Sequence, residues 1–124
     1  MFSLPKYFSM LILIAGPYRS GTNDDPVLME QNLARLEAAA LKVHRLGHLP
    51  MVGEWVALPI MKLAGMKTIG DAVWEATQYP VAHQLLEKCD AVYRIAGASK
   101  GADMDVQVAK RRGLPVYYRV EDIP

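Results

Sequence analysis

The sequence predicts a three-layer α/β sandwich, in which helices cover both faces of an open parallel sheet of four to five strands. Three observations lead to this fold class. Residues 10–15 form a continuous aliphatic run, which is typical of a strand covered on both faces. Segments with helical periodicity separate this run from three further strand candidates. Strands joined through helices pair in parallel, by right-handed crossovers.

The longest helix is predicted directly after the first strand and its loop. Asp25 is a suitable N-cap, Pro26 fits the first helical position, and Gly47 fits the residue just past the end. Apolar residues recur between them at steps of three and four, which predicts a helix with one apolar face. These residues are Met29, Leu33, Leu36, Ala39, Ala40, Val43 and Leu46.

A second strand and two or three helices are expected in the middle of the chain. Residues 48–52 are the strand candidate, and Pro50 suits a strand start or an edge strand. Residues 55–64 are apolar enough for a short helix, with Pro59 in its first turn or at a kink. Another helix is expected over residues 69–77, before Pro80 breaks the chain and a new helix covers residues 81–88.

The C-terminal third repeats the order of strand, loop, helix and strand. Residues 90–95 are the third strand candidate, and residues 97–101 form a loop. A helix over residues 102–112 ends at Gly113, and residues 114–119 form the last strand. With alternating strands and helices along the whole chain, the α/β class follows.

Composition favours a single domain over residues 1–124, because no linker, repeat or low-complexity segment divides it. Fourteen Lys and Arg residues against thirteen Asp and Glu residues leave a formal charge of +1. Such a balance provides no field that would steer nucleic acid or an anionic membrane to the protein. Cys89 is the single cysteine, so it cannot form an internal disulfide and indicates a reducing compartment.

The N-terminal region bears on cellular location. Residues 10–15 are far fewer than the roughly 20 apolar residues that span a bilayer. Lys6 precedes the apolar stretch, as in an export signal, but residues 17–19 stand where a small-residue cleavage site would be expected. We therefore expect a cytoplasmic protein that has neither a membrane nor a nucleic acid as its partner.

Two loops are candidate sites, because ligands of open parallel sheets bind outside the carboxyl ends of the strands. The first loop follows the first strand and contains Gly16, Tyr18, Arg19 and Ser20. Tyr18 can stack on a flat base or bond to a sugar, and Arg19 can bind a carboxylate or phosphate. A solvated turn without a ligand is the alternative. The loop has neither a Walker motif nor a dinucleotide-binding glycine pattern, which argues against ATP hydrolysis and dinucleotide binding.

The second loop starts near Gly97 and leads through Ser99 and Gly101 into a helix. Backbone N–H groups at the helix start, together with the Ser99 hydroxyl, can bind an anion. Asp103 and Asp105 lie near that start, where the helix dipole favours carboxylates, and ordinary capping is the alternative role. The two positions are separated by about 200° of rotation, so only one of them can face a given pocket.

Other polar and aromatic residues are weaker candidates. Glu54 and Trp55 follow the second strand and can line the cleft, although Trp55 is equally typical of a core. His83 lies on a predicted helix near the cleft, where it can serve acid–base chemistry or simply be exposed. His44 and His48 have the spacing of a metal pair, but the helix ends between them, so we predict no metal site.

Five short motifs follow one another along the chain. They are residues 14–20 (IAGPYRS), 46–50 (LGHLP), 88–93 (KCDAVY), 99–109 (SxGxxxDxxxA) and 112–116 (RGLPV). In this order and spacing they resemble the motifs of the nucleoside 2-deoxyribosyltransferase-like family, which includes a branch of deoxynucleoside 5′-monophosphate N-glycosidases. The likeness covers nearly the whole chain in the order of its elements.

The resemblance implies a flavodoxin-like fold and an enzyme, without a cofactor, that cleaves the N-glycosidic bond of a deoxynucleoside or a nucleoside 5′-monophosphate. In the family a carboxylate attacks C1′ of the sugar, and water or a second base then accepts the sugar. Asp105 falls on the nucleophile, which is usually Glu, and Asp103 is the alternative carboxylate. Ser99 falls on a residue that contacts the 5′ end of the substrate, whereas Tyr18 and Arg19 fall in the loop that faces sugar and base.

A second interpretation follows from a difference between this sequence and the family. Family enzymes often carry a further Asp on the helix before the third strand, but residues 79–84 of this chain contain no acid. The alternative is therefore a non-catalytic nucleotide-binding or sensing module on the same fold. We also expect a homo-oligomer, a dimer or tetramer, because residues 55–66 are strongly apolar with Lys62 as their only charge.

Overall fold

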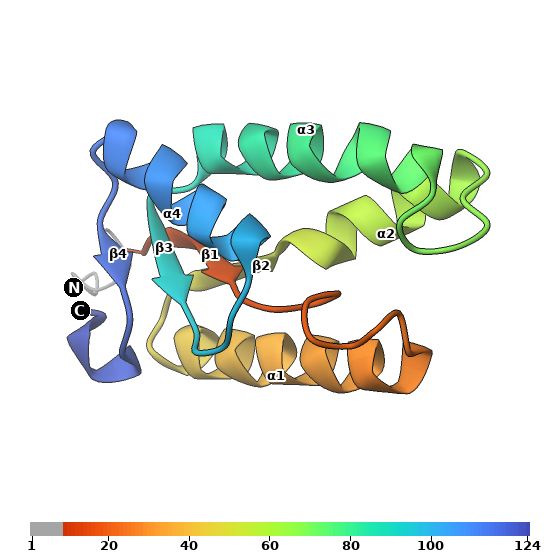
Figure 1. The fold of residues 1–124 in the computed structure, drawn as a ribbon. Helices are drawn as coiled ribbons and strands as arrows, with labels where there is room; N and C mark the ends of the chain where they lie inside the picture. The colour runs from red at the N-terminus through yellow and green to blue at the C-terminus, as the bar shows by residue number, and fades with distance from the viewer. Residues whose placement is uncertain (1–8) are drawn as a thin grey trace.

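The computed structural model describes residues 9–124, so Lys6, considered above for an export signal, lies outside the described residues. Four strands form one parallel sheet in the order β2-β1-β3-β4 (Figure 1). They are β1 (Leu11–Ala15), β2 (Leu49–Val52), β3 (Ala91–Arg94) and β4 (Val116–Tyr117). The predicted fold class, a flavodoxin-like α/β sandwich with an open parallel sheet, is confirmed.

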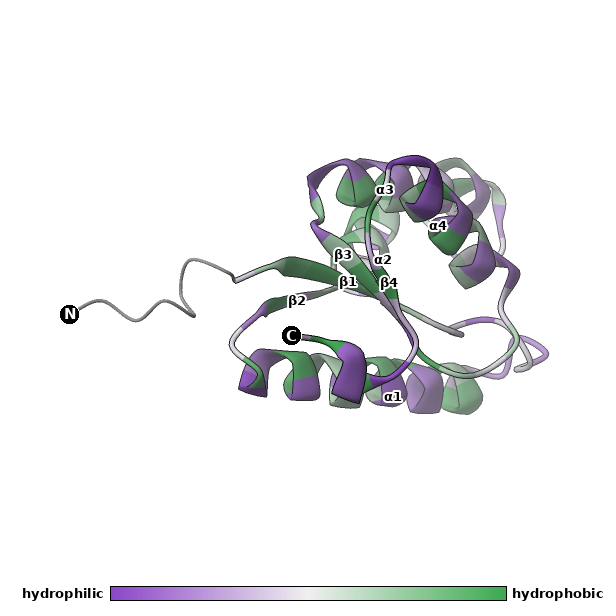
Figure 2. Cartoon of the chain, turned by 90° about the vertical axis from the view of Figure 1, so that its left-hand side faces the viewer, coloured by the Kyte–Doolittle hydropathy of each residue, from purple (hydrophilic) through white to green (hydrophobic). Residues whose placement is uncertain are grey.

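Helices lie on both sides of this sheet (Figures 1 and 2). α1 (Pro26–Arg45) covers one face together with the 3-10 turn Val120–Asp122, whereas α3 (Ala72–Lys88) and α4 (Lys100–Arg111) cover the other. α2 (Gly53–Leu63) continues directly from β2 and packs against α3. Within residues 9–124, no helix combines the length and apolar composition that crossing a bilayer requires.

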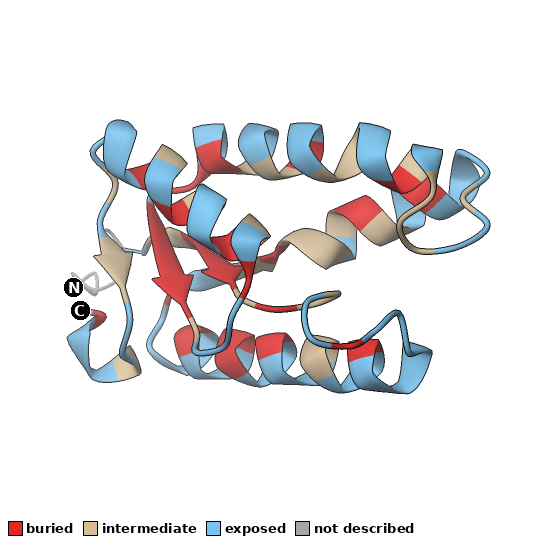
Figure 3. Cartoon of the chain, in the orientation of Figure 1, coloured by how far each residue is buried: buried red, intermediate tan, exposed pale blue. Residues whose placement is uncertain are grey.

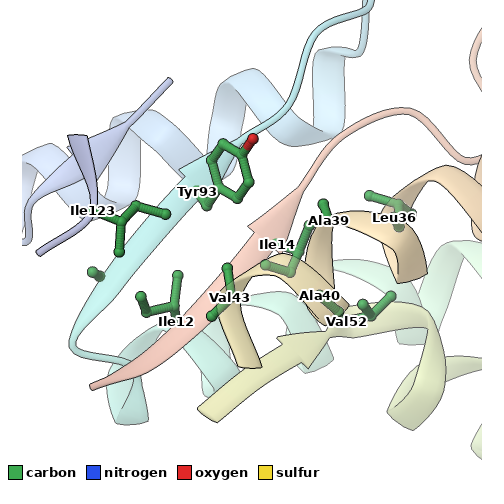
Figure 4. Close-up of a cluster of buried hydrophobic side chains, with 10 residues drawn as sticks. Ile12, Ile14, Leu36, Ala39, Ala40, Val43, Val52, Tyr93 and Ile123 are labelled. Carbon is green, nitrogen blue, oxygen red and sulfur yellow. The ribbon is translucent and has the colours of Figure 1, made fainter. Parts of the chain in front are cut away.

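The two sides of β1 belong to two different parts of the core, because successive side chains of a strand point to opposite faces. Ile12 and Ile14 pack with Leu36 and Val43 of α1 (Figure 4). Leu13 and Ala15 face the opposite layer and pack with the helices there. Most of β1 and all of β3 are buried (Figure 3), which explains why the first strand reads as an unbroken aliphatic run.

α1 begins and ends as the sequence predicts. The Asp25 carboxylate accepts a hydrogen bond of 2.9 Å from the Val27 N–H, and Pro26 occupies the first helical position. Gly47, just past the end, has a φ of 94°, a left-handed conformation that glycine adopts without steric cost. The helix therefore carries its own start and stop signals.

The expectation that Pro80 separates two helices was wrong. α3 runs unbroken from Ala72 to Lys88 with Pro80 in its interior, which removes one intrahelical hydrogen bond and costs about 3 kcal/mol. Trp74 on one side of Pro80 and Val81 and Leu86 on the other are all buried. Burial of side chains on both sides of the proline offsets that cost, because a fully buried large apolar side chain contributes about 1.5–3 kcal/mol.

Two further elements differ from the predicted ones. α2 starts at Gly53, so Pro59 lies inside the helix rather than in its first turn. The last strand is only Val116–Tyr117 instead of residues 114–119. Pro115 has no N–H to donate to the sheet, although its carbonyl accepts a hydrogen bond of 3.0 Å from the Val92 N–H. β4 is at the edge of the sheet and pairs with a neighbouring strand on one side only, so fewer hydrogen bonds stabilise a longer strand there.

Candidate active site

A cavity of about 70 Å³ lies at the carboxyl end of β1. The strand order β2-β1-β3-β4 reverses direction between β1 and β3, which is where ligands bind in open parallel sheets. Residues from β1 and from three helices line the cavity. They include Ala15 and Gly16 from the end of β1, Gly53 and Glu54 from α2, Gln78, Tyr79 and Ala82 from α3, and Gly101 and Asp105 from α4.

Glu54 and Asp105 are the two acids of this cavity, and both side chains are half-buried. Loss of hydration, with a further contribution from the negative charge of Glu54, raises the pKa of Asp105 to about 7, although Arg94 acts in the opposite direction. Burial also raises the pKa of Glu54. Two carboxyl groups coupled in this way can share one proton near neutral pH, so that one is an acid and the other a charged nucleophile.

Asp103 lies outside this cavity. Its side chain is 67% exposed, and its Oδ1 accepts a hydrogen bond of 3.0 Å from the Arg94 guanidinium. Asp105 lines the cavity from the same helix. The rotation of about 200° between the two positions explains why one carboxylate faces the cavity and the other does not.

Ser20, from the first loop, and Ser99 and Gly97, from the second, line one groove, so the fold brings the two loops together. This groove encloses about 590 Å³ and also contains Arg35 and Lys100. Its described lining has two cations and no carboxylate. The groove is therefore suited to an anionic group.

A third opening of about 370 Å³ connects the cavity to this groove. It shares Gln78, Tyr79 and Gly101 with the cavity, and Ser20 and Lys100 with the groove. We call these three neighbouring openings the trough. Its cavity end contains the acids Glu54 and Asp105, and its groove end contains the cations Arg35 and Lys100. The opening between them is lined by charges of both signs, namely Arg19, Asp24, Glu75 and Lys100. A ligand with an electron-deficient carbon at one end and a phosphate at the other matches this polarity.

Arg19 and Tyr18 contact protein side chains. Nε of Arg19 lies 2.7 Å from Oδ1 of Asp24, and its Nη1 lies 3.9 Å from Oε1 of Glu75. The Tyr18 ring stacks on Trp74, with 6.2 Å between ring centroids. Burial, and then the charges of Glu54 and Glu30, raise the pKa of Tyr18. Tyr18 lines none of the openings described above but a separate one that it shares with Glu30 and Lys67, whereas Arg19 lines the connecting opening.

Trp55 and His83 do not line the cavity or either groove. Trp55 is 41% exposed, and its Nε1 donates a hydrogen bond of 2.7 Å to Oε2 of Glu37 on α1. His83 is exposed on α3, with its ring 6.3 Å from that of Tyr79.

His44 and His48, which have the sequence spacing of a pair of metal ligands, lie on either side of the end of α1. His44 is exposed, whereas His48 is buried. Nδ1 of His48 accepts a hydrogen bond of 3.0 Å from the Met10 N–H, and its Nε2 lies 2.7 Å from the Pro124 carbonyl oxygen. Both ring nitrogens are thus engaged with the backbone. Among residues 9–124, no three His, Cys, Asp or Glu side chains are grouped as a metal ion requires.

Sequence reasoning missed Arg35 and Gln78, which line the trough, and Arg94, which does not line it but pairs with Asp103. In the sequence, Arg35 is one of several charged residues on the polar face of α1, and Gln78 belongs to no motif. Arg94 is a charged residue at the end of an otherwise apolar strand, which is the one signal that was available. Comparisons of this chain with protein-family models, with curated proteins and with solved structures found no match.

Proposed function

We propose that the protein cleaves the N-glycosidic bond of a nucleoside 5′-monophosphate, as an N-glycosidase or a deoxyribosyltransferase. The observation that carries the proposal is the trough that joins the Glu54 and Asp105 carboxyl pair to a basic groove. The family resemblance of the sequence motifs supports the same chemistry. A nucleotide fits with C1′ at the acids and its phosphate near Lys100 and Arg35.

In the proposed reaction, a carboxylate oxygen of Asp105 attacks C1′, and the bond from C1′ to the base nitrogen breaks. The electron pair of that bond leaves with the base, which takes the proton of the neutral Glu54 carboxyl group. Water, or the nitrogen of a second base, then attacks C1′ and passes its proton to the Glu54 carboxylate, while the bond from C1′ to Asp105 breaks and releases the Asp105 carboxylate. Positive charge develops on the sugar in both steps, and an adjacent carboxylate stabilises it.

The proton of the acid pair defines the pH range of this reaction. The pKa of Asp105 is raised to about 7 and that of Glu54 is also raised, so the pair holds a proton near neutral pH, and this proton is on Glu54 when Asp105 attacks. Cleavage requires one proton and one negative charge on the pair, and the developing charge on the sugar favours ionised Asp105 during the reaction. Base release is therefore expected to decline above about pH 7, where both groups are charged.

The proposed phosphate end is tested by Lys100→Gln and Arg35→Gln, with Arg45→Gln at the far end of α1 as the matched control. Base release from a panel of nucleoside 5′-monophosphates is followed by chromatography. We expect each groove variant to raise KM roughly ten- to a hundredfold, because a charged hydrogen bond to phosphate contributes roughly 1.5–3 kcal/mol. The corresponding nucleosides should show no such change. Equal effects on nucleotides and nucleosides would place the phosphate elsewhere.

The alternative is a non-catalytic nucleotide-binding or sensing module. The reason to consider it is that the helix before the third strand lacks the further acid that family enzymes often carry. In the structure, however, α2 supplies a second carboxylate, that of Glu54, to the cavity. The same panel separates the two functions. Nucleotide binding that depends on Lys100, with no free base from any substrate, would favour the sensing module.

We also propose that the apolar surface of α2 binds a second copy of the chain. Leu63, Ile60 and Trp55 are 89%, 44% and 41% exposed on this helix. Leu63→Glu is expected to convert the oligomer to monomers, because burying an unpaired carboxylate in an apolar interface is costly. Sedimentation at several protein concentrations measures the mass. A wild-type protein that is monomeric throughout would contradict this expectation.

A further inference from the structure

Arg94 is a buried cation whose role is not explained by the proposed reaction. It ends β3, a strand whose other residues are the apolar Ala91, Val92 and Tyr93. Its side chain is only 9% exposed. An arginine in such a position loses its hydration and persists only where its donors find partners.

The partners of Arg94 connect three separate parts of the second loop and its helix. Its guanidinium donates to the carbonyl oxygens of Ile95 and, at 2.9 Å, of Gly97, and to Oδ1 of Asp103 at 3.0 Å. The first two partners lie in the loop, and Asp103 lies in the first turn of α4. The same turn is capped by Ser99, whose Oγ accepts a hydrogen bond of 3.1 Å from the Ala102 N–H.

These contacts hold the first turn of α4 in position and thereby fix the orientation of Asp105, which lies one helical turn after Gly101. A rotation of α4 about its axis would turn Asp105 out of the cavity and bring Asp103 toward it, because the two side chains differ by about 200°. The bond from Arg94 to Asp103 opposes that rotation. A planar guanidinium with several donors provides such a constraint, whereas a flexible ammonium group does not.

The charged surroundings of Asp105 come from two elements. From α2, Glu54 opposes the ionisation of Asp105, and from β3, Arg94 favours it. α3 presents Tyr79 and Gln78 to the cavity, and β1 presents uncharged residues. On α4 itself, Asp103 is paired with Arg94. Among the described residues, Arg94 is therefore the cation whose charge lowers the pKa of Asp105.

We propose that Arg94 is a positioning residue of this site, which holds the first turn of α4 against the end of β3 and places a fixed positive charge beside Asp105. The catalytic consequence rests on the function proposed above. The electrostatic consequence does not, because it can be measured on the protein without substrate.

The experiment compares Arg94→Met and Arg94→Lys with Arg112→Met as the matched control. Arg112 also donates to main-chain carbonyls, those of Leu86 and Glu87, but it does not line the cavity. The titration of Asp105 is followed by carboxyl carbon-13 NMR, with Asp105→Asn used for assignment. Base release is measured over the same pH range.

Arg94→Met is expected to move the midpoint of the Asp105 titration away from its wild-type value of about 7. The midpoint rises if Asp105 stays in the cavity and only the positive charge is lost, and it falls if α4 rotates and the Asp105 carboxylate regains water. The decline of base release at high pH should move with it. Arg94→Lys should keep the midpoint near the wild-type value but lower kcat on the order of a hundredfold, because a misplacement of about 1 Å has that effect. Arg112→Met should lower stability and leave the midpoint in place.

An unchanged midpoint in a folded Arg94→Met protein would overturn the proposal and leave Arg94 a purely structural residue. If Arg94→Met does not fold, Arg94→Gln, which keeps a hydrogen-bond donor, is measured instead. An unchanged midpoint in Arg94→Gln would overturn the proposal in the same way. A shifted midpoint without base release from any nucleotide would contradict the proposed glycosidase and support the electrostatic role of Arg94.

Discussion

Asp105→Asn is expected to lower base release from the best nucleotide substrate by a thousandfold or more, because the amide cannot attack C1′ and loss of a nucleophile has effects of roughly this size or larger. Single-turnover assays near pH 6.5, with chromatographic detection of the free base, measure the effect. Nucleotide affinity should change much less, since the groove with Lys100 is intact.

Two variants serve as controls for this result. Asp103→Asn removes the charge of an exposed carboxylate two residues earlier on α4 but keeps the side-chain oxygen that accepts the hydrogen bond from Arg94, so it should lower base release by no more than about tenfold. Asp105→Glu keeps a carboxylate at the position and should retain measurable base release. If Asp103→Asn were inactive and Asp105→Asn active, Asp103 would be the nucleophile.

The second large effect concerns stability, because Asp105 titrates at about 7 in the folded protein and at an ordinary value of 3.8 when unfolded. Folding therefore favours its neutral form. The contribution of Asp105 to stability is full below pH 3.8, falls as the pH rises, and is lost above about pH 7. Asp105→Asn keeps a neutral group at every pH, so it should stabilise the protein by about 2–4 kcal/mol at pH 8.

Thermal and urea unfolding at pH 4 and pH 8 measure this effect as the difference between wild type and variant at the two pH values. At pH 4 the two proteins should be nearly equally stable, since the wild-type side chain is then neutral in the folded state. Asp103→Asn, whose carboxylate is exposed and paired, should show no gain at pH 8. If the variant and the wild type differed in stability by the same amount at both pH values, burial of the ionised Asp105 carboxylate would not destabilise the folded protein.

The parts of the fold that could be predicted from sequence are those with local signals. The cap at Asp25, the proline after it and the glycine at position 47 define α1 without reference to the rest of the chain. Pro80 shows the limit of such signals. Its local preference is to end a helix, but the burial of Trp74 and Leu86 on either side decides otherwise.

The sequence indicated a candidate site only at the level of loops. The rule for open parallel sheets directed attention to the segments after β1 and β3, and the structure brings their residues Ser20 and Ser99 to one groove. The partners of the loop residues were not predictable. Arg19, for example, lies against Asp24, a residue with a φ of 60° that local sequence does not reveal.

The sequence by itself determined the class of the fold, the order of its elements and the two segments in which acids and hydroxyls gather, because periodicity, caps and turns act between neighbours along the chain. Only the tertiary structure decided that Asp105 rather than Asp103 faces the cavity, that Glu54 lies there with it, and that Arg94 is buried beside α4. Those outcomes depend on how α4 is rotated and packed against β3 and α2, and packing acts between residues far apart in sequence.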